Sequence, residues 1–403
     1  MVNKNAVSNW PLAPRRAWLA VASIALGSFA LVVTELLPIA TIGPIASSLG
    51  VSEGTAGLTI AIPAIVSAVF AFVMSAFPVR ADRRLLILAF SALLLVSDVA
   101  SMLAPSFSFL LFARVLLGVA VGGFWAISAS LAPQLVHAKG VGLGTALVFG
   151  GISIGSVVAV PAASFIEHLA GWRETFLIAS VLGVLVVAFQ AVAVPRMPAT
   201  GGGSLKALPR LFAKREVVVL LAAALLIWTG QLAGYTYISP FLGSEHFAPT
   251  LIGGLLLAYG IGGVVGNFGI GPLAAKHTRA VVVSILALLV AAMVAALLLP
   301  ASPVVAVVVL GSWGVAFGAV PAAMQAWMFR AAGDDFPAGS AMLVAILQVA
   351  IAIGAAVGGV WVDGFGLSAA IWFGAALVAA GLALVGLLGR ARRGNGRLAA
   401  DFA

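Results

Sequence analysis

The sequence is divided into twelve long, predominantly apolar runs, and this pattern constrains the fold more than any other feature. An α-helix rises 1.5 Å per residue, so about 20 apolar residues cross the ~30 Å hydrocarbon core of a bilayer. Each run is at least about this long, which predicts a membrane-spanning helix. The runs cover residues 18–40, 54–77, 85–104, 107–133, 141–165, 172–194, 216–241, 250–273, 280–299, 304–329, 338–362 and 367–389.

The composition excludes the other classes of fold. Charged residues make up only 8% of the 403 residues, and apolar residues make up 63%. A soluble domain has roughly a quarter charged residues, so this chain has too few to cover a water-exposed surface. The same composition excludes intrinsic disorder. A β-barrel is disfavoured because its strands alternate apolar and polar residues, whereas these runs are continuous. We therefore expect an all-α membrane protein.

The sequence lacks the motifs of common enzyme sites. No cysteine is present, which excludes disulfides, thiol catalysis and cysteine-bound metals. The four histidines lie at expected helix ends and predict no metal cluster. There is no GxxxxGK phosphate loop, no HExxH helix and no Ser-His-acid set. We expect a protein that is not an enzyme, needs no metal or cofactor, and does not use ATP.

The basic residues indicate which side of the membrane each connection faces. All but two of the 21 lysines and arginines fall near the termini or the even-numbered connections. The exceptions are Arg114, within a run, and Arg173. The positive-inside rule then predicts a multi-pass protein of the bacterial inner (plasma) membrane with both termini in the cytoplasm. The net charge of +9 therefore reflects topology, and we expect no nucleic-acid partner because no basic stripe with interleaved aromatic residues is present.

The longest connection, residues 195–215, divides the chain into two parts of six runs each. It contains Gly201–Ser204 followed by basic residues, a composition typical of a flexible cytoplasmic linker. We expect residues 1–194 and 216–403 to form two six-helix halves. A basic turn follows the second run of each half, as expected for the parallel repeats of a secondary transporter. We expect the protein to act in the lipid bilayer as a monomer.

Three ionisable side chains inside expected spans are interpreted as proton-coupling residues: Glu35, Asp98 and Arg114. Such a group costs several kcal/mol unless it is paired or faces water. A movement or a substrate that separates Arg114 from Glu35 would change the proton affinity of the carboxylate. The alternative is an arginine–acid pair that locks helix packing. Asp98 has two further interpretations: an ion-pair or cap partner of Arg114, or a side chain that reaches the membrane interface.

Polar and aromatic side chains within the runs predict a cavity for a small-molecule substrate. Residues 114, 118, 121, 125 and 128 share one face of the fourth run, and a tryptophan there can stack on a planar ligand. All three tyrosines fall in the seventh and eighth runs. Helix packing is the alternative for each aromatic residue, including a stripe of Trp313, Phe317, Met324 and Trp327 that we interpret as a cavity wall. The substrate-binding candidates are Phe124, Trp125, Ser128, Gln231, Tyr235, Tyr259, Asn267 and Gln325, and Gln348 is a further polar residue in the eleventh run.

Three motifs resemble those of the major facilitator superfamily, specifically its drug:proton antiporter-like branch. They are the turn Pro78–Arg84, the RxxxG sequence Arg114–Gly118, and Gly155–Pro161 followed by Gly171–Arg173. In the turn, Pro78 and Leu85 stand where the family usually has glycine, and Val160 replaces a glycine before Pro161. The resemblance implies a major facilitator fold, with twelve transmembrane helices in two six-helix halves.

The same resemblance implies roles for individual residues. Asp82 would pair with a helix end at a cytoplasmic gate, and Arg83 and Arg84 would meet the second half. The RxxxG sequence is associated with proton transfer. The antiporter motif implies export rather than import. Its residues are Gly151, Gly155 and Pro161.

Further stretches resemble bacterial efflux transporters for purine ribonucleosides. They are Thr34–Pro38, Gly122–Ser130, Phe149–Ile154, Gly230–Gln231 and Tyr237. The resemblance implies export of nucleosides such as inosine and guanosine, and their analogues, by antiport with protons. Sugar exporters share part of these features, so sugar or multidrug efflux by the same mechanism is the alternative. A proton symport importer and a non-transporting membrane protein also remain open.

Overall fold

The computed structural model describes residues 14–76, 81–128, 131, 135–136, 141–197, 208–299 and 302–388. Twelve helical segments in this part are long and apolar enough to cross a membrane, which confirms the predicted number of spans. The described residues contain no β-strand. Gly201–Ser204 of the expected linker, together with Pro78 and Ser130 of two quoted motifs, lies outside the described residues.

The first half contains six spanning helices. They are α1 (Pro14–Leu49), α3 (Leu58–Ala76), α4 (Arg83–Met102), α5 (Phe107–Ser128), α7 (Val141–Ala170) and α8 (Trp172–Ala193), and the short α2 (Glu53–Ala56) precedes α3. Within the expected linker lies a short helix, α9 (Leu208–Phe212). The second half contains α10 (Arg215–Tyr235), α11 (Ile238–Ser244), α12 (Pro249–Leu298), α13 (Pro303–Ala332), the 3-10 turn η3 (Gly333–Asp335), α14 (Phe336–Phe365) and α15 (Leu367–Leu388).

The eighth and ninth spans differ from the expectation because both lie within α12. The spans are Pro249–Gly269 and Arg279–Leu298. The residues between them, 270–278, stay helical although they include Gly271 and Pro272, the two residue types that most readily interrupt helical hydrogen bonding. The predicted connection therefore does not separate two helices in the structure.

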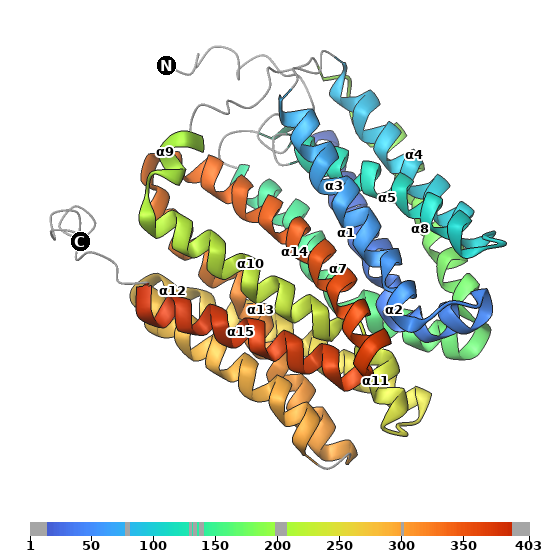
Figure 1. Cartoon of the computed structure of the whole chain (residues 1–403). Helices are drawn as coiled ribbons and strands as arrows, with labels where there is room; N and C mark the ends of the chain where they lie inside the picture. Colours follow the sequence, from blue (N-terminus) through green and yellow to red (C-terminus); the bar gives the residue numbers. More distant parts are fainter. Residues whose placement is uncertain are drawn as a thin grey trace, which may run out of the picture.

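Figure 1 shows the two halves side by side, with α2 and α11 at the end of the bundle away from both termini. We call this end the opposite face, and the end near the termini the termini face. Contacts between the halves join α1 with α11, α3 with α14, α2 with α14, and α7 with α12. The helix pairs show that the interface is built from first-half helices α1, α2, α3 and α7.

The buried apolar residues form two clusters that show where the halves meet. One cluster lies in the first half and includes Ile24 and Leu31 of α1 with Phe124 of α5. The other joins Ile39 of α1 to second-half residues such as Tyr237. Since α1 begins at the termini face, its first part packs within its own half, and its last part enters a core shared by both halves. The two halves are therefore held together toward the opposite face.

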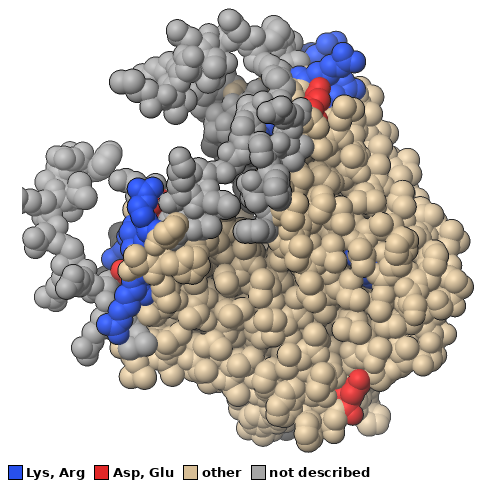
Figure 2. All heavy atoms as spheres, turned by 45° about the horizontal axis from the view of Figure 1, so that its top comes forward, with Lys and Arg blue, Asp and Glu red and all other residues tan. Residues whose placement is uncertain are grey.

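The surface is apolar along the helices and charged at their ends. Figure 2 shows lysine and arginine side chains near the termini face and a broad uncharged area beside them. Large apolar side chains are exposed along the helices, for example Leu185, Val265 and Val308. Such exposure is unfavourable in water and favourable in lipid, so the hydrocarbon core of a bilayer covers this surface.

Candidate transport site

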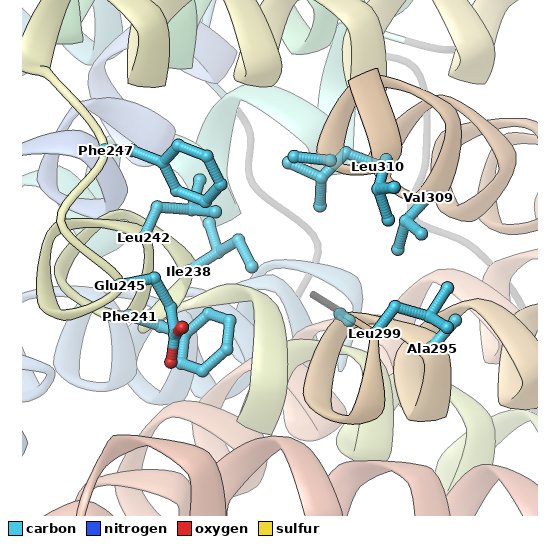
Figure 3. Close-up of a pocket in the computed structure, with 12 residues that line it drawn as sticks. Ile238, Phe241, Leu242, Glu245, Phe247, Ala295, Leu299, Val309 and Leu310 are labelled. Carbon is cyan, nitrogen blue, oxygen red and sulfur yellow. The ribbon is translucent and has the colours of Figure 1, made fainter. Parts of the chain in front are cut away.

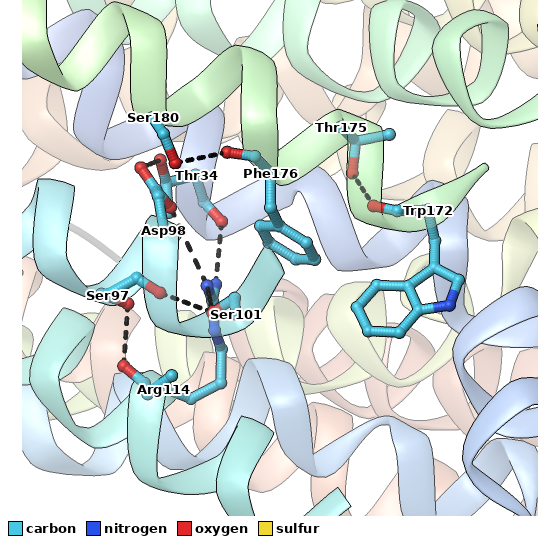
Figure 4. A network of polar contacts seen from close by, with 10 residues as sticks. Thr34, Ser97, Asp98, Ser101, Arg114, Trp172, Thr175, Phe176 and Ser180 are labelled. Atoms are coloured by element: carbon cyan, nitrogen blue, oxygen red, sulfur yellow. Dashed lines mark hydrogen bonds and ion pairs between the residues drawn. The ribbon is translucent and has the colours of Figure 1, made fainter. Parts of the chain in front are cut away.

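Arg114 lies at the centre of a buried polar network in the first half (Figure 4). Its side chain and that of Asp98 have no exposed surface, and their nearest charged atoms are 3.9 Å apart. The guanidinium also donates to the Thr34 carbonyl at 3.3 Å and to the Ser101 hydroxyl at 2.6 Å. It lies over the Phe176 ring, 4.8 Å from its centre. Four helices, α1, α4, α5 and α8, thus contribute to the environment of one cation.

Asp98 is bound on both sides by this network. The Thr34 hydroxyl donates to its carboxylate at 3.1 Å, and Arg114 supplies the counter-charge. The interpretation of Asp98 as an ion-pair partner of Arg114 agrees with this geometry, whereas a position at the membrane interface does not, because Asp98 is fully buried.

Within the described residues, no ion pair joins Arg114 to Glu35. Arg114 bonds instead to the backbone carbonyl of Thr34, the residue before Glu35. Side chains at successive positions of a helix point about 100° apart, so Thr34 faces α4 and α5 while Glu35 points elsewhere. Glu35 is therefore linked to the network through the backbone of α1, and not by an ion pair.

Glu35 lies where the two halves meet, next to Gln348 of α14. The Gln348 side-chain amide donates to the Ser67 hydroxyl of α3 at 3.2 Å, so it bridges the halves. The Oε1 atoms of Glu35 and Gln348 are both buried and have no hydrogen-bond partner. Buried acceptors are normally satisfied, so unpaired ones indicate a place for a proton, a water molecule or a ligand.

Three of the predicted substrate-binding residues come together in the second half. The Gln231 amide donates to the Tyr259 hydroxyl at 2.8 Å and accepts from the Trp313 indole at 2.7 Å. Tyr235 and Tyr259 stack with ring centres 4.2 Å apart. Gln231 and Trp313 are fully buried, so the cluster is closed in this conformation.

The other predicted substrate-binding residues are more dispersed. Phe124 and Trp125 of α5 make an edge-to-face contact with ring centres 5.7 Å apart. Ser128 and Gln325 each have a buried oxygen without a partner, and Asn267 is half-buried. Within the described residues, no hydrogen bond connects these three polar side chains to the Gln231 cluster. Their grouping into one cavity remains a prediction.

The predicted gate residues Asp82 and Arg84 bond to the end of α8 and to the residues that follow it. Asp82 caps α4 by accepting from the Arg84 amide at 2.8 Å, and it also accepts from the Met197 amide at 3.0 Å. Arg84, expected to meet the second half, donates instead to the Ala191 carbonyl of α8 at 2.7 Å. The backbone amide of Arg83 donates to the Met197 carbonyl. The shared core lies at the other end of the bundle, which explains why Arg84 binds to its own half.

The glycines of the antiporter motif bring α7 against α1. A Cβ atom at Gly151 would lie 2.4 Å from the Ala25 carbonyl oxygen, and one at Gly155 would lie 3.1 Å from Val32. A larger side chain at Gly151 would therefore separate the two backbones. Pro161 follows on the same helix, near the point where α7 faces Gly253 of α12.

A group of polar contacts joins the halves at the opposite face, and we call it the opposite-face contact. Asp363 of α14 accepts from the Ser52 hydroxyl at 2.6 Å and from the Gly54 amide at 3.0 Å. The Tyr237 hydroxyl lies 3.3 Å from the Gly54 carbonyl oxygen, and burial together with nearby carboxylates raises the pKa of Tyr237. A Cβ atom at Gly54 would lie 2.2 Å from the Gly359 carbonyl oxygen, so the two helices pack at backbone distance.

We expect Asp363→Ala to weaken closure of the opposite face, because it removes the two hydrogen bonds that join α14 to Ser52 and Gly54. A loss of roughly 1 kcal/mol lowers the ratio of closed to open molecules about fivefold. Gly54→Ala is expected to act more strongly, since its methyl group collides with α14. The chain has no cysteine, so spin labels at Ser47→Cys and Phe365→Cys report the distance between the halves without background.

Glu245→Ala is the matched control, because Glu245 is an acidic residue at the end of α11 on the same face. It should leave the distance distribution unchanged. Equal distributions in wild type, Asp363→Ala and Gly54→Ala would show that the opposite-face contact does not hold the halves together.

A pocket lies away from all of these residues (Figure 3). It is formed by α11, the end of α12 and the start of α13, and its lining is apolar except for Glu245. It contains none of the predicted substrate-binding residues, so we do not assign it to the transport site.

Sequence analysis did not identify Asp363, Ser67 or Trp313 as hydrogen-bond partners of other residues. Asp363 is a polar residue near a helix end, and only the packing of the halves brings it to Ser52. Ser67 is a polar residue within a helix, and the same packing brings it to Gln348. Trp313 belongs to the stripe that we interpreted as a cavity wall, and its indole N–H identifies it as a partner of Gln231. The signal that could have found it is the need of a buried indole for an acceptor.

Comparison with known proteins supports the fold and the class of protein. The sequence profile of the Major Facilitator Superfamily matches residues 17–338. The purine ribonucleoside efflux pump NepI of Salmonella paratyphi B is 32% identical over 354 residues, covering 88% of this chain and 89% of the relative. The pump of the same name from Shigella sonnei is 32% identical over 366 residues, with 90% and 92% covered.

Solved structures show the same architecture. A bacterial homolog of the human lysosomal transporter Spinster, inward-facing and unoccupied, aligns with a TM-score of 0.72 at 15% identity over 93% of this chain and 95% of that one. Its inward-facing, occupied form aligns with a TM-score of 0.74 at 15% identity over 94% and 97%. This chain is a multi-pass transporter of the bacterial inner membrane, and it belongs to the Major Facilitator Superfamily.

Proposed function

We propose that this transporter exports purine ribonucleosides in exchange for protons, by alternating access between its two halves. The observation that carries the proposal is the position of Glu35, a carboxylate with an unpartnered buried oxygen at the contact between the halves. A charge at such a place is costly, so its protonation and the closure of the halves depend on each other. The 32% identity to pumps named for purine ribonucleoside efflux supports the direction and the substrate class.

The aromatic and amide side chains suit this class of substrate. Purine bases offer flat faces for stacking, and ribose hydroxyls and base edges offer donors and acceptors. Phe124 and Trp125 provide aromatic surface in the first half. Gln231, Tyr235 and Tyr259 provide both kinds of contact in the second. Opening of the Gln231 cluster, with exchange of its internal bonds for bonds to substrate, is part of the proposal.

The arrangement of the halves supports an assignment of which end of the molecule faces the cytoplasm. The shared core and the opposite-face contact close one end of the molecule. The basic residues favour a cytoplasmic position for the other end, where the termini lie. We infer that the structure represents the inward-facing stage, in which substrate enters from the cytoplasm.

Transport by everted membrane vesicles tests the proposal. Their interior corresponds to the outer side of the membrane, so an acidic interior should drive uptake of radiolabelled inosine. We expect uptake at least about tenfold above that of empty-vector vesicles, and collapse of the pH gradient with nigericin should abolish it. Unlabelled guanosine should compete, whereas lactose, ethidium and chloramphenicol should not.

Other results would favour the alternatives. Competition by lactose or ethidium, without effect of guanosine, would replace the nucleoside assignment with sugar or multidrug efflux. Inosine uptake driven by an alkaline interior would indicate symport and overturn antiport. Unchanged uptake with nigericin would remove proton coupling.

A further inference from the structure

The orientation of the Gln231 amide is fixed by one residue of another helix, Trp313 of α13. An indole N–H can only donate, so the Gln231 atom that lies 2.7 Å from it is the carbonyl oxygen, Oε1. The amide nitrogen therefore faces Tyr259 of α12, and it donates to the hydroxyl of that residue at 2.8 Å. Without the indole, the amide could turn over and exchange the places of its oxygen and nitrogen.

The packing of three helices holds this arrangement in place. Gln231, Tyr259 and Trp313 are all buried. A Cβ atom at Gly314, next to Trp313 in the chain, would collide with the Tyr259 carbonyl oxygen, so α12 and α13 touch at backbone distance here. The Tyr259 ring stacks on Tyr235 and also meets the indole edge-on, with ring centres 6.4 Å apart. The indole and the phenol ring are therefore held in fixed positions on either side of the amide.

The open positions of the cluster that face the Tyr235–Tyr259 stack are hydrogen-bond donors. The Gln231 amide nitrogen carries two hydrogens, and one of them is bound to Tyr259. The Tyr259 oxygen accepts that bond, which leaves its own O–H able to donate. Within the part of the chain that the structure describes, neither remaining hydrogen has an acceptor. A ligand that stacks on the two tyrosine rings therefore needs an acceptor at the edge that faces Gln231.

Purines differ in exactly this property at position 6 of the ring. Guanine and hypoxanthine carry an oxygen there, which accepts, whereas adenine carries an amino group, which donates. The oxygen can bind to either open donor of the cluster. An amino group in the same place would bring two donors together and leave a buried donor without an acceptor, which costs more than a missing contact. The cluster therefore suits a 6-oxopurine better than a 6-aminopurine.

We propose that Trp313 makes this site selective for purine nucleosides with an oxygen at position 6, because it holds the donor side of Gln231 toward the Tyr235–Tyr259 stack. This inference rests on the proposed function and adds a distinction within the purine class. Trp313 is a positioning residue, since it acts on the base through the amide. N7 accepts in both kinds of purine, so a site that bound only N7 would not distinguish them.

Equilibrium competition on the purified, full-length transporter in detergent tests the proposal. Unlabelled inosine, guanosine and adenosine compete with radiolabelled inosine at a single pH. We expect wild type to bind inosine and guanosine about tenfold more tightly than adenosine, the size of effect that hydrogen bonds to a base edge produce. Purine riboside, which has only a hydrogen atom at position 6, should lie between them, because it loses the bond but brings no second donor.

Removal of the indole N–H should abolish the preference. In Trp313→Phe the amide can present its oxygen or its nitrogen, so we expect inosine and adenosine to bind with nearly equal affinity. Trp313→Tyr fills more of the space, and its hydroxyl donates or accepts, so it should have the same effect and decides the outcome if Trp313→Phe does not fold. Tyr259→Phe should keep the preference, because the indole still orients the amide. The ratio of the two affinities thus separates positioning from loss of packing.

Trp327→Phe is the matched control. Trp327 lies on the same helix as Trp313, and its indole also donates to a side chain of α10, the carboxylate of Glu216, at 3.0 Å. The substitution removes an equivalent bond between α13 and α10 while Gln231 keeps its orientation. The ratio of inosine affinity to adenosine affinity should therefore match that of wild type.

The two proposals fail in different ways. If wild type binds no purine nucleoside, the proposed function is wrong and this inference falls with it. If wild type binds inosine and adenosine equally, or prefers adenosine, the selectivity of the site is overturned while nucleoside export stands. If wild type prefers inosine but the Trp313 variants keep that preference, or Trp327→Phe loses it as well, the role of Trp313 is overturned.

Discussion

Replacing Glu35 by glutamine is expected to abolish proton-driven efflux while exchange of substrate down its own gradient persists. Glutamine has nearly the same shape and keeps hydrogen-bonding groups, but it cannot gain or lose a proton. The contact between the halves around Ser67 and Gln348 can therefore still form. The variant should fold and bind substrate, because only the titration of position 35 is removed.

The two activities are measured in the same proteoliposomes. Inosine transport driven by a pH gradient should fall at least about tenfold, toward the rate of empty liposomes. Inosine counterflow, with equal pH on both sides, should remain within a few-fold of wild type. Persistence of the pH-gradient dependence in Glu35→Gln would show that the coupling group lies elsewhere.

Glu216→Gln is the control for loss of a carboxylate near the membrane. Glu216 lies in the first turn of α10 and accepts from the Trp327 indole at 3.0 Å, within the second half. A glutamine oxygen can accept the same bond. We expect both activities of this variant to match those of wild type.

The sequence predicted the fold because the thickness of a bilayer fixes the length of each helix. The structure contains twelve candidate spans, as the twelve apolar runs predict, and the family match implies the same number. The short helices α2, α9 and α11 and the continuity of α12 were not predicted. They depend on local hydrogen bonding and packing at the helix ends, and apolar run length carries no information about these.

The site was predictable to the extent that burial of a polar group is costly. Glu35, Asp98 and Arg114 stand out in any apolar run for this reason. The partner of Arg114 was not predictable, because spacing along one helix does not show which residues of other helices face it. The contacts of Gln348 with Glu35 and of Asp363 with Ser52 depend on how the second half packs against the first, which the sequence does not show.

The second large effect is expected at Arg114. Arg114→Ala leaves Asp98 as a buried charge without its counter-ion, and the loss of one partner of a buried pair typically costs about 3–5 kcal/mol. It also removes the bonds to Thr34 and Ser101 and the contact with Phe176. We expect a large fall in thermal stability, measured on purified protein in detergent by the temperature of half-maximal aggregation.

Arg114→Lys separates charge from geometry. Lysine keeps the positive charge near Asp98, but it lacks the planar fork that reaches Thr34, Ser101 and the Phe176 ring together. We expect stability between that of wild type and Arg114→Ala. Proton-driven transport should fall further than the loss of stability explains, because the Thr34 carbonyl next to Glu35 loses its hydrogen bond from the guanidinium.

The double variant Arg114→Met with Asp98→Leu distinguishes packing from coupling. Replacement of both partners of a buried ion pair by apolar residues of similar volume is often neutral for stability. We therefore expect the double variant to regain most of the stability that Arg114→Ala loses. We expect it to lack proton-driven transport, since the guanidinium no longer bonds to the Thr34 carbonyl next to Glu35. If the double variant transports inosine with the wild-type pH dependence, the Asp98–Arg114 pair serves only to pack the first half, and Glu35 functions without it.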